Sequence, residues 1–317
     1  MEELQFDLLK KLIFDCYGRC RYEKALDFAK LAAEAFPEKM PQTSYWLACL
    51  YSRLENTDQA MTVLNEAIDK KIWWSPKRLM SDEDLLPLQK LEAFQYILQV
   101  NHDMEKKAME SAKAGVVIYT PTKYKETGIY PLLLSLHWQN GNANEYSQYW
   151  RNAKVLEDFI LAFPQSSQIS AVDEYHWNDE VLAEKEIKET YQNILKDFKI
   201  NRDKMLITGT SQGAKLAIKL ALKNQDQCYK GFIAVIPIIS EAEIEELIPQ
   251  IYSAAMKGIR GCIIASIQDI HYSNTIKLYE TFIKAKFPCK LIKINTIGHQ
   301  LPEDLSKKLK RALSYVL

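Results

Sequence analysis

The residues best suited to chemistry lie in the segment Gly209-Thr210-Ser211-Gln212-Gly213. A strand-like apolar run precedes this segment and a helical pattern follows it, which is the setting in which Gly-x-Ser-x-Gly forms a nucleophile elbow. Both glycines are needed there, because a side chain two residues either way from the serine would collide with the neighbouring strand or helix. The pattern predicts an exposed Ser211 nucleophile, with the backbone N–H of Gln212 as an oxyanion donor. An ordinary glycine turn is the alternative interpretation.

A serine nucleophile needs a base, and in this class the chain order is serine, then Asp or Glu, then His. Only two histidines, His271 and His299, lie downstream of Ser211. His299 follows the apolar strand pattern of residues 290–294, and a loop at the carboxyl end of a late strand is where a base can reach the serine. We therefore predict His299 as the base. His271 competes for that role, but a loop or pocket-lining position explains it more simply.

The orienting acid is predicted to be Asp269. It ends the run of residues 262–269, a pattern typical of a buried strand with a loop at its carboxyl end. From there its carboxylate would orient His299 through Nδ1 and stabilise the imidazolium that forms during attack. A strand-end turn or a helix cap is the alternative role for Asp269. The predicted catalytic set is Ser211, Asp269 and His299.

A second oxyanion donor should come from the loop after an earlier strand. Residues 130–142 supply that setting, with an apolar strand pattern that ends in His137 and a short loop that contains Gly141.

Residues from about 112 to 317 resemble the alpha/beta-hydrolase superfamily, close to its phospholipase/carboxylesterase branch. That branch commonly carries a His-Gly-x-Gly-type loop, a Gly-x-Ser-Gln-Gly elbow, an Asp after a late strand and a Gly-His pair near the carboxyl end. This chain matches in the elbow, in Asp269 and in Gly298-His299. It departs in the oxyanion loop, where Trp138 and Asn140 replace the usual glycines.

The resemblance implies the backbone N–H of Gln139 as the second oxyanion donor, with that of Trp138 as the alternative. One such donor typically contributes about 10²–10³ in rate. The candidate substrate-binding residues are His137, Gln165 and Trp177, which lie on segments expected at the same edge of the sheet. For the aromatic residues of this region, packing is an equally good explanation.

Charge and composition exclude several classes of protein. Lys plus Arg and Asp plus Glu are equal at 41 each, so the formal net charge is zero. A nucleic-acid-binding protein would need a basic face, so this class is not expected. The longest apolar run, residues 232–239, contains a proline and is too short to span a bilayer. The first residues lack the basic and apolar regions of a signal peptide, which predicts a cytoplasmic protein without membrane insertion.

The cysteines predict a reducing environment. Most of them fall within helix or strand patterns, where reduced cysteine behaves as a small buried hydrophobe. Two lie four residues apart on one helix face, but no second pair has the spacing of metal ligands, so we expect no structural zinc. No metal or organic cofactor is needed for the predicted chemistry. The six cysteines are Cys16, Cys20, Cys49, Cys228, Cys262 and Cys289.

The first hundred residues carry an internal repeat. The segment that ends in Ala25 recurs in the segment that ends in Ala60, 35 residues later, and Ala32 matches Ala67 at the same offset. Each unit pairs two helical patterns: residues 4–17 with 22–36, and residues 43–54 with 57–70. A period near 34 with small residues at fixed places resembles tetratricopeptide-like repeats. A generic antiparallel helical bundle is the alternative, and in either case the helices could bind a protein partner.

The fold class predicted is α/β, an alpha/beta-hydrolase fold preceded by an all-α helical domain. We expect residues 1–105 to form the helical domain and residues 111–317 the catalytic domain, with the polar stretch 101–111 at the boundary. Strand patterns alternate with helical patterns, as in an open and largely parallel sheet. The expected strands are residues 115–120, 132–136, 159–163, 205–208, 232–236, 261–267 and 290–294. The expected helices are residues 142–152, 179–198, 212–223, 241–256, 273–286 and 302–316.

These features predict a serine hydrolase that cleaves a small carboxylic ester or thioester through an acyl-enzyme. A serine peptidase on the same fold is one alternative. The other is a non-catalytic interaction or scaffold protein with a degenerate hydrolase domain, for which the unusual Trp138 loop is the best support.

Overall fold

The computed structural model describes residues 2–151, 153–223 and 229–317. The chain forms two compact units. The helical unit comprises Met1–Ala112 together with Ile169–Asp173, and the sheet unit comprises Lys113–Gln168 and Glu174–Leu317. The chain therefore passes between the two units three times. Cys228 lies outside the described residues.

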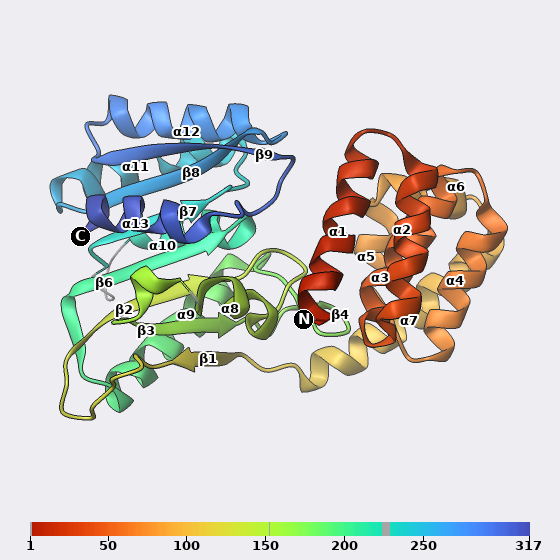
Figure 1. Cartoon of the computed structure of the whole chain (residues 1–317), viewed down its shortest axis with the longest axis horizontal. Coiled ribbons are helices and arrows are strands. Elements are labelled where there is room, and N and C mark those ends of the chain that lie inside the picture. Colours follow the sequence, from red (N-terminus) through yellow and green to blue (C-terminus); the bar gives the residue numbers. More distant parts are fainter. Residues whose placement is uncertain (1, 152, 224–228) are drawn as a thin grey trace. The chain divides into compact units, whose positions relative to one another are not determined.

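The helical unit is built from antiparallel helix pairs (Figure 1). Its longer helices are α1 (Glu2–Gly18), α2 (Tyr22–Ala35), α3 (Met40–Arg53), α4 (Thr57–Asp69) and α7 (Glu92–Ser111), and shorter ones are α5 (Pro76–Ser81) and α6 (Leu86–Gln89). The four alanines of the 35-residue repeat are all fully buried. Their small side chains let each helix approach its neighbour closely, which explains the repeat physically. The resemblance to tetratricopeptide repeats stays a prediction.

Helix α7 contains the whole polar stretch that the sequence suggested as a boundary, so this stretch is regular helix. Within it, Asn101 is buried and makes two hydrogen bonds. Its Oδ1 accepts the Trp74 N–H at 2.7 Å, and its Nδ2 donates to the Ile97 carbonyl at 2.8 Å. The polar residue is therefore part of the helical core and does not mark a linker.

Strand β4 (Ile169–Ala171) belongs to the helical unit, although it lies in the second half of the chain. The Ser75 N–H donates to the Ser170 carbonyl at 2.7 Å, and Trp74 forms a β-bridge with Ala171. Ala171 and Trp74 are both fully buried in the same apolar cluster. The sequence assigned these residues to the catalytic domain, because nothing in their local pattern shows which core they join.

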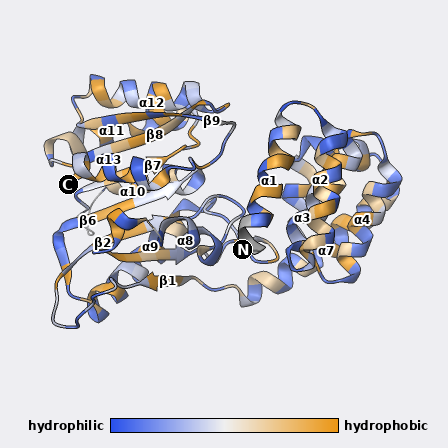
Figure 2. Ribbon diagram, in the orientation of Figure 1, coloured by the Kyte–Doolittle hydropathy of each residue, from blue (hydrophilic) through white to orange (hydrophobic). Residues whose placement is uncertain are grey.

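The sheet unit has one seven-stranded sheet in the order β1-β3-β2-β6-β7-β8-β9. Strand β1 is antiparallel to β3, and the other pairs are parallel. The strands are β1 (Gly115–Tyr119), β2 (Tyr130–Leu136), β3 (Ile160–Gln165), β6 (Ile200–Thr210), β7 (Gly231–Val235), β8 (Arg260–Gln268) and β9 (Cys289–Ile297). Apolar residues dominate β3 and β8 (Figure 2), as expected for strands covered on both faces.

Helices cover both faces of the sheet. One apolar core joins the sheet to α9 (Glu180–Asp197), α10 (Gln212–Lys223), α11 (Glu241–Met256) and α12 (Tyr272–Lys284). The opposite core joins it to α8 (Ala143–Arg151) and α13 (Leu305–Val316). Along β2, Leu132 and Leu134 belong to the first core and Leu133 to the second, which is the alternation of a strand.

The structure confirms the predicted fold class, and each of the seven expected strands forms. The expected helix at residues 142–152 is α8; Asn152, at its predicted end, lies outside the described residues. The sequence did not predict the direction of β1 or the short strands β4 and β5 (Glu174–Tyr175). Among the described residues, no helix is both long enough and apolar enough to cross a membrane.

Candidate active site

Ser211 occupies a tight turn between β6 and α10. Its φ is 58°, a left-handed conformation that is uncommon for a residue with a side chain. A Cβ on Gly209 would lie 2.3 Å from the backbone of Gly213, and a Cβ on Gly213 would lie 2.3 Å from the Leu136 carbonyl oxygen. Only glycine fits at either place, so the turn has the geometry expected of a nucleophile elbow.

The three residues predicted to form the catalytic set are joined by hydrogen bonds. Asp269 follows β8 and His299 follows β9, and these parallel neighbours bring both side chains to the sheet edge at which β6 ends. His299 Nδ1 lies 2.6 Å from Asp269 Oδ2, and His299 Nε2 lies 2.8 Å from Ser211 Oγ. In the neutral imidazole, Nδ1–H donates to the carboxylate, which leaves the Nε2 lone pair to accept the serine proton.

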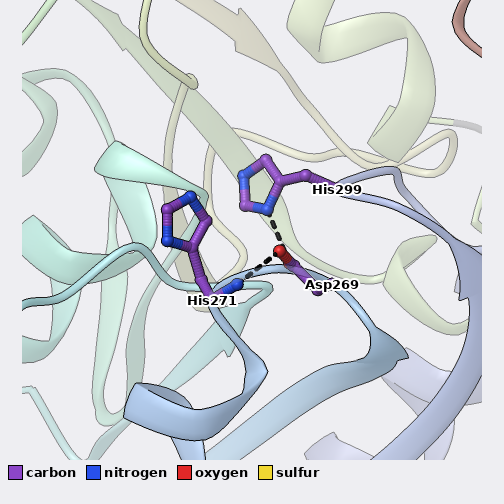
Figure 3. Close-up of side chains that lie close together, drawn as sticks. All are labelled: Asp269, His271 and His299. Atoms are coloured by element: carbon purple, nitrogen blue, oxygen red, sulfur yellow. Dashed lines mark hydrogen bonds and ion pairs between the residues drawn. The ribbon is translucent and has the colours of Figure 1, made fainter. Parts of the chain in front are cut away.

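The surroundings of Asp269 keep its carboxylate ionised. Burial acts to raise the pKa of this group, but hydrogen bonds from His299 and from the His271 backbone outweigh burial and hold the pKa below its usual value. The His271 N–H donates to Oδ1 at 3.0 Å, while His299 uses Oδ2. Figure 3 shows these two contacts. A carboxylate fixed through both oxygens can hold one orientation of the His299 ring.

His271 lies beside His299, the predicted base. Its ring centroid is 5.3 Å from that of His299, and the rings are nearly perpendicular. Burial and the neighbouring His299 both lower the pKa of His271, so its imidazole is neutral at neutral pH. It is His299 that reaches Ser211 Oγ.

Gln212, the candidate oxyanion donor, begins helix α10. Because a first-turn N–H has no acceptor inside its own helix, this N–H is available to an anion, which the helix dipole also favours. The Gln212 side chain has a separate task. Its Oε1 accepts the Trp177 N–H at 2.9 Å and its Nε2 donates to Asn178 Oδ1 at 2.7 Å.

The loop after β2 has Trp138 and Asn140 where related loops have glycines, and contacts with neighbouring segments fix its path. Asn140 has a φ of 59°, and its N–H donates to the Tyr175 carbonyl at 2.8 Å. The Tyr175 N–H in turn donates to the Gly141 carbonyl at 2.9 Å. The Trp138 ring packs edge-on against Tyr146 and also against Tyr149, both on α8. The bulky Trp138 side chain is therefore accommodated against α8, and the loop keeps a defined path.

The three residues predicted to bind substrate support this loop from within. His137 and Trp177 have exposed fractions of 0% and 1%. The Trp177 Nε1–H donates to the His137 carbonyl at 2.9 Å, and the two rings lie 4.6 Å apart. Gln165 accepts the Ala143 N–H at 2.8 Å. His137 and Trp177 are thus buried and Gln165 is half-buried, and a role of these three residues in substrate binding stays a prediction.

Burial lowers the pKa of His137 to about 4, so its imidazole is neutral. Its Nδ1–H donates to the Trp138 carbonyl at 2.8 Å, while Nε2 is buried without a hydrogen-bond partner among the described residues. The ring therefore fixes the carbonyl of the residue that precedes Gln139. No sequence signal identified this supporting role.

In the part of the chain that the structure describes, two groups of side chains have the composition of metal ligands. One is Asp269, His271 and His299, and the other is Cys49, Asp82 and Asp84 in the helical unit. The second group already has partners, because Tyr17 and Arg53 bind Asp84 and the Tyr45 hydroxyl donates to Asp82. Only the first group combines two imidazoles with a carboxylate.

The seven-stranded sheet, the elbow after β6 and the serine–histidine–aspartate hydrogen bonds define the class of protein: the chain is an α/β hydrolase. More closely, it belongs to the Chlorophyllase family, whose model matches residues 91–264. Residues 5–109 match the model of the A/B hydrolase-like N-terminal domain. The resemblance to alpha/beta-hydrolases is therefore confirmed, and the helices before the sheet are similar to the N-terminal domain that the second model describes.

Solved structures give the same fold. An uncharacterized protein from Bacillus cereus ATCC 10987 is 25% identical with a TM-score of 0.54, and the match covers 98% of both chains. A ferulic acid esterase is 15% identical with a TM-score of 0.54, over 66% of this chain and 94% of that one. Esterase PE8 is 16% identical with a TM-score of 0.51, over 65% and 100%. A search of curated proteins found no match.

Proposed function

We propose that this protein is a serine hydrolase that cleaves carboxylic esters or thioesters through an acyl-enzyme. One observation carries the proposal: His299 Nε2 lies 2.8 Å from Ser211 Oγ while its Nδ1 lies 2.6 Å from Asp269. This is the spacing at which a base can take the serine proton in the reaction.

In the first half-reaction, His299 Nε2 accepts the Ser211 proton as Oγ attacks the ester carbonyl carbon. The negative charge moves to the carbonyl oxygen, where the N–H groups of Gln212 and Gln139 would bind it. Asp269 stabilises the imidazolium. Collapse of the intermediate then breaks the bond to the alcohol or thiol, which leaves with the proton from His299.

In the second half-reaction, water replaces the alcohol. His299 takes a proton from the water as its oxygen attacks the acyl carbon, and the same donors bind the oxyanion. Collapse returns the proton to Ser211 Oγ and releases the acid. The cycle is balanced by water alone, so the proposed chemistry requires no other co-reactant.

The setting supports an active hydrolase over a degenerate one. The oxyanion loop lacks the usual glycines, yet Tyr175, Trp177 and His137 hold its backbone through four hydrogen bonds. We also propose a reducing, cytoplasmic setting, which the five free cysteines among the described residues support.

The test is labelling of the full-length protein with a fluorophosphonate, which reacts with an activated serine. Ser211→Ala should abolish labelling and ester turnover while the circular dichroism spectrum stays the same. Ser314→Ala, at an exposed serine on α13, is the matched control and should label normally. Equal labelling of Ser211→Ala would exclude this nucleophile. Comparison of a p-nitrophenyl ester with a peptide p-nitroanilide then separates an esterase from a peptidase.

A further inference from the structure

His271 has no part in the proposed reaction, yet it lies against the candidate active site. It follows Asp269 by two residues, at the turn that begins α12. Its backbone N–H donates to Asp269 Oδ1, and this bond holds the turn in place. Its imidazole is then next to that of His299, with the carboxylate adjacent to both (Figure 3).

These three side chains offer a ligand set for a transition-metal ion. One nitrogen from each imidazole and one oxygen of Asp269 all lie within 4.8 Å of one another. Zinc bonds of about 2.0–2.2 Å in a tetrahedral site set ligand atoms roughly 3.3–3.6 Å apart. Side-chain rotations that move these atoms by about 1 Å are therefore enough to close the site.

The position of the cluster also suits a metal. Both imidazoles are partly exposed, so an ion can reach them from solvent.

We propose that Asp269, His271 and His299 bind a Zn²⁺ ion, and that bound zinc switches the enzyme off. Two imidazoles and one carboxylate form a set that zinc accepts, with a fourth position left for water. The loss of turnover rests on the proposed function, whereas binding of the ion does not.

The inhibition follows from the dual use of His299. A metal on Nε2 takes the lone pair that would accept the Ser211 proton. A metal on Nδ1 displaces the proton shared with Asp269, which passes to solvent. In either arrangement the imidazole can no longer shuttle a proton between Ser211 and the leaving group. No bond in the protein is broken, so removal of the ion restores the original state.

The experiment measures binding and turnover separately in full-length protein. Isothermal titration calorimetry with zinc chloride at neutral pH should give one ion per chain. Zinc should also abolish hydrolysis of a p-nitrophenyl ester, and EDTA should restore it. Magnesium, which prefers oxygen ligands, should neither bind at this site nor inhibit.

Variants at His271 identify the site. His271→Gln and His271→Asn should each weaken zinc binding and raise the inhibitory zinc concentration by at least about tenfold, because one ligand is lost. The zinc-free turnover of each variant serves as its own reference. His102→Gln is the matched control, at an exposed histidine of α7, and should behave as wild type.

The outcomes separate the two proposals. If the wild type hydrolyses the ester but zinc neither binds nor inhibits, the zinc site is wrong and the proposed function stands. If zinc inhibits both His271 variants at the wild-type concentration, the zinc site is equally wrong, because the ion acts elsewhere. If zinc binds through His271 but no ester is hydrolysed, the zinc site stands and the proposed function fails.

Discussion

His137 is a buried imidazole whose charge state couples folding to pH. Burial lowers its pKa from the ordinary 6.5 to about 4 in the folded chain. Between these values the unfolded chain binds more protons than the folded one, so protons favour unfolding. Above about pH 6.5, His137 is neutral in both states and does not lower the free energy of unfolding. As the pH falls from about 6.5 toward about 4, protonation of His137 in the unfolded chain lowers the free energy of unfolding.

We therefore predict that the free energy of unfolding falls by about 2 kcal/mol at about pH 5, relative to neutral pH, through His137 alone. Urea unfolding at the two pH values measures this difference. His137→Gln should remove this part of the pH dependence, whatever its effect on absolute stability. His102→Gln, at an exposed histidine, should keep it. A pH dependence that is the same in His137→Gln and wild type would contradict the assignment.

Some residues of the candidate site are marked by a local sequence pattern, and others are defined only by contacts with distant segments of the chain. The proximity of Ser211, Asp269 and His299 could be predicted because an elbow motif and two strand ends are local patterns. The order of the three residues along the chain, serine before aspartate before histidine, supported their selection. The contacts that His137, Gln165 and Trp177 make could not be predicted. Trp177 forms hydrogen bonds with Gln212 and His137, which lie 35 and 40 residues away along the chain. No local sequence pattern encodes such contacts.

At the scale of elements, helix α10 approaches the end of β2 so closely that only glycine fits between them. A Cβ at Gly213 would lie 2.3 Å from the Leu136 carbonyl oxygen and 2.4 Å from that of His137. Both obstacles are backbone atoms, so a substitution must move either the helix or the oxyanion loop. We therefore expect such a substitution to lower both the free energy of unfolding and the reactivity of Ser211.

Gly213→Ala should lower the free energy of unfolding by roughly 1–3 kcal/mol, the usual cost of overpacking. It should also slow fluorophosphonate labelling of Ser211, because the oxyanion loop shifts. Denaturant unfolding and labelling rate measure the two effects. Gly18→Ala is the matched control: nothing lies within 4 Å of its Cβ, and it ends an exposed helical turn. A Gly213→Ala protein as stable and as reactive as the control would contradict the close approach.

The sequence predicted the seven strands of the main sheet because each is an apolar run bounded by turns. It missed β4 and β5, which have three and two residues and are too short to show a period. It also missed the antiparallel direction of β1, because an apolar run looks the same in either direction. The polar stretch 101–111, which the sequence suggested as the boundary, is the last part of helix α7, and the helical unit ends just after it at Ala112.

At the scale of the whole molecule, the helical unit includes a segment that follows three strands of the main sheet along the chain. Ala171 is fully buried in the apolar core of the helices, beside Trp74. A charged side chain at this position would have to be buried without a partner or force the segment out. Its effect should therefore appear in the helices, far away in sequence.

Ala171→Glu should speed hydrogen exchange of the buried amides of α4 and α7, because the helical unit loses stability. Mass spectrometry of the peptides from these helices measures the change. Ala114→Glu, at an exposed alanine, is the matched control and should leave exchange unchanged. If α7 exchanges at the wild-type rate in Ala171→Glu, residues 169–173 do not contribute to the stability of the helices.

The same arrangement sets an order of events during synthesis. A ribosome completes the first 112 residues before it reaches Ser170 and Ala171. The nascent helices therefore lack part of their apolar core until that segment has been synthesised. Strands β1, β2 and β3 are made in that interval. The core of the helices that are translated first is therefore complete only after more than half of the chain has been translated. If a recombination event transferred residues 1–112 alone to another protein, the helices would lack strand β4 there.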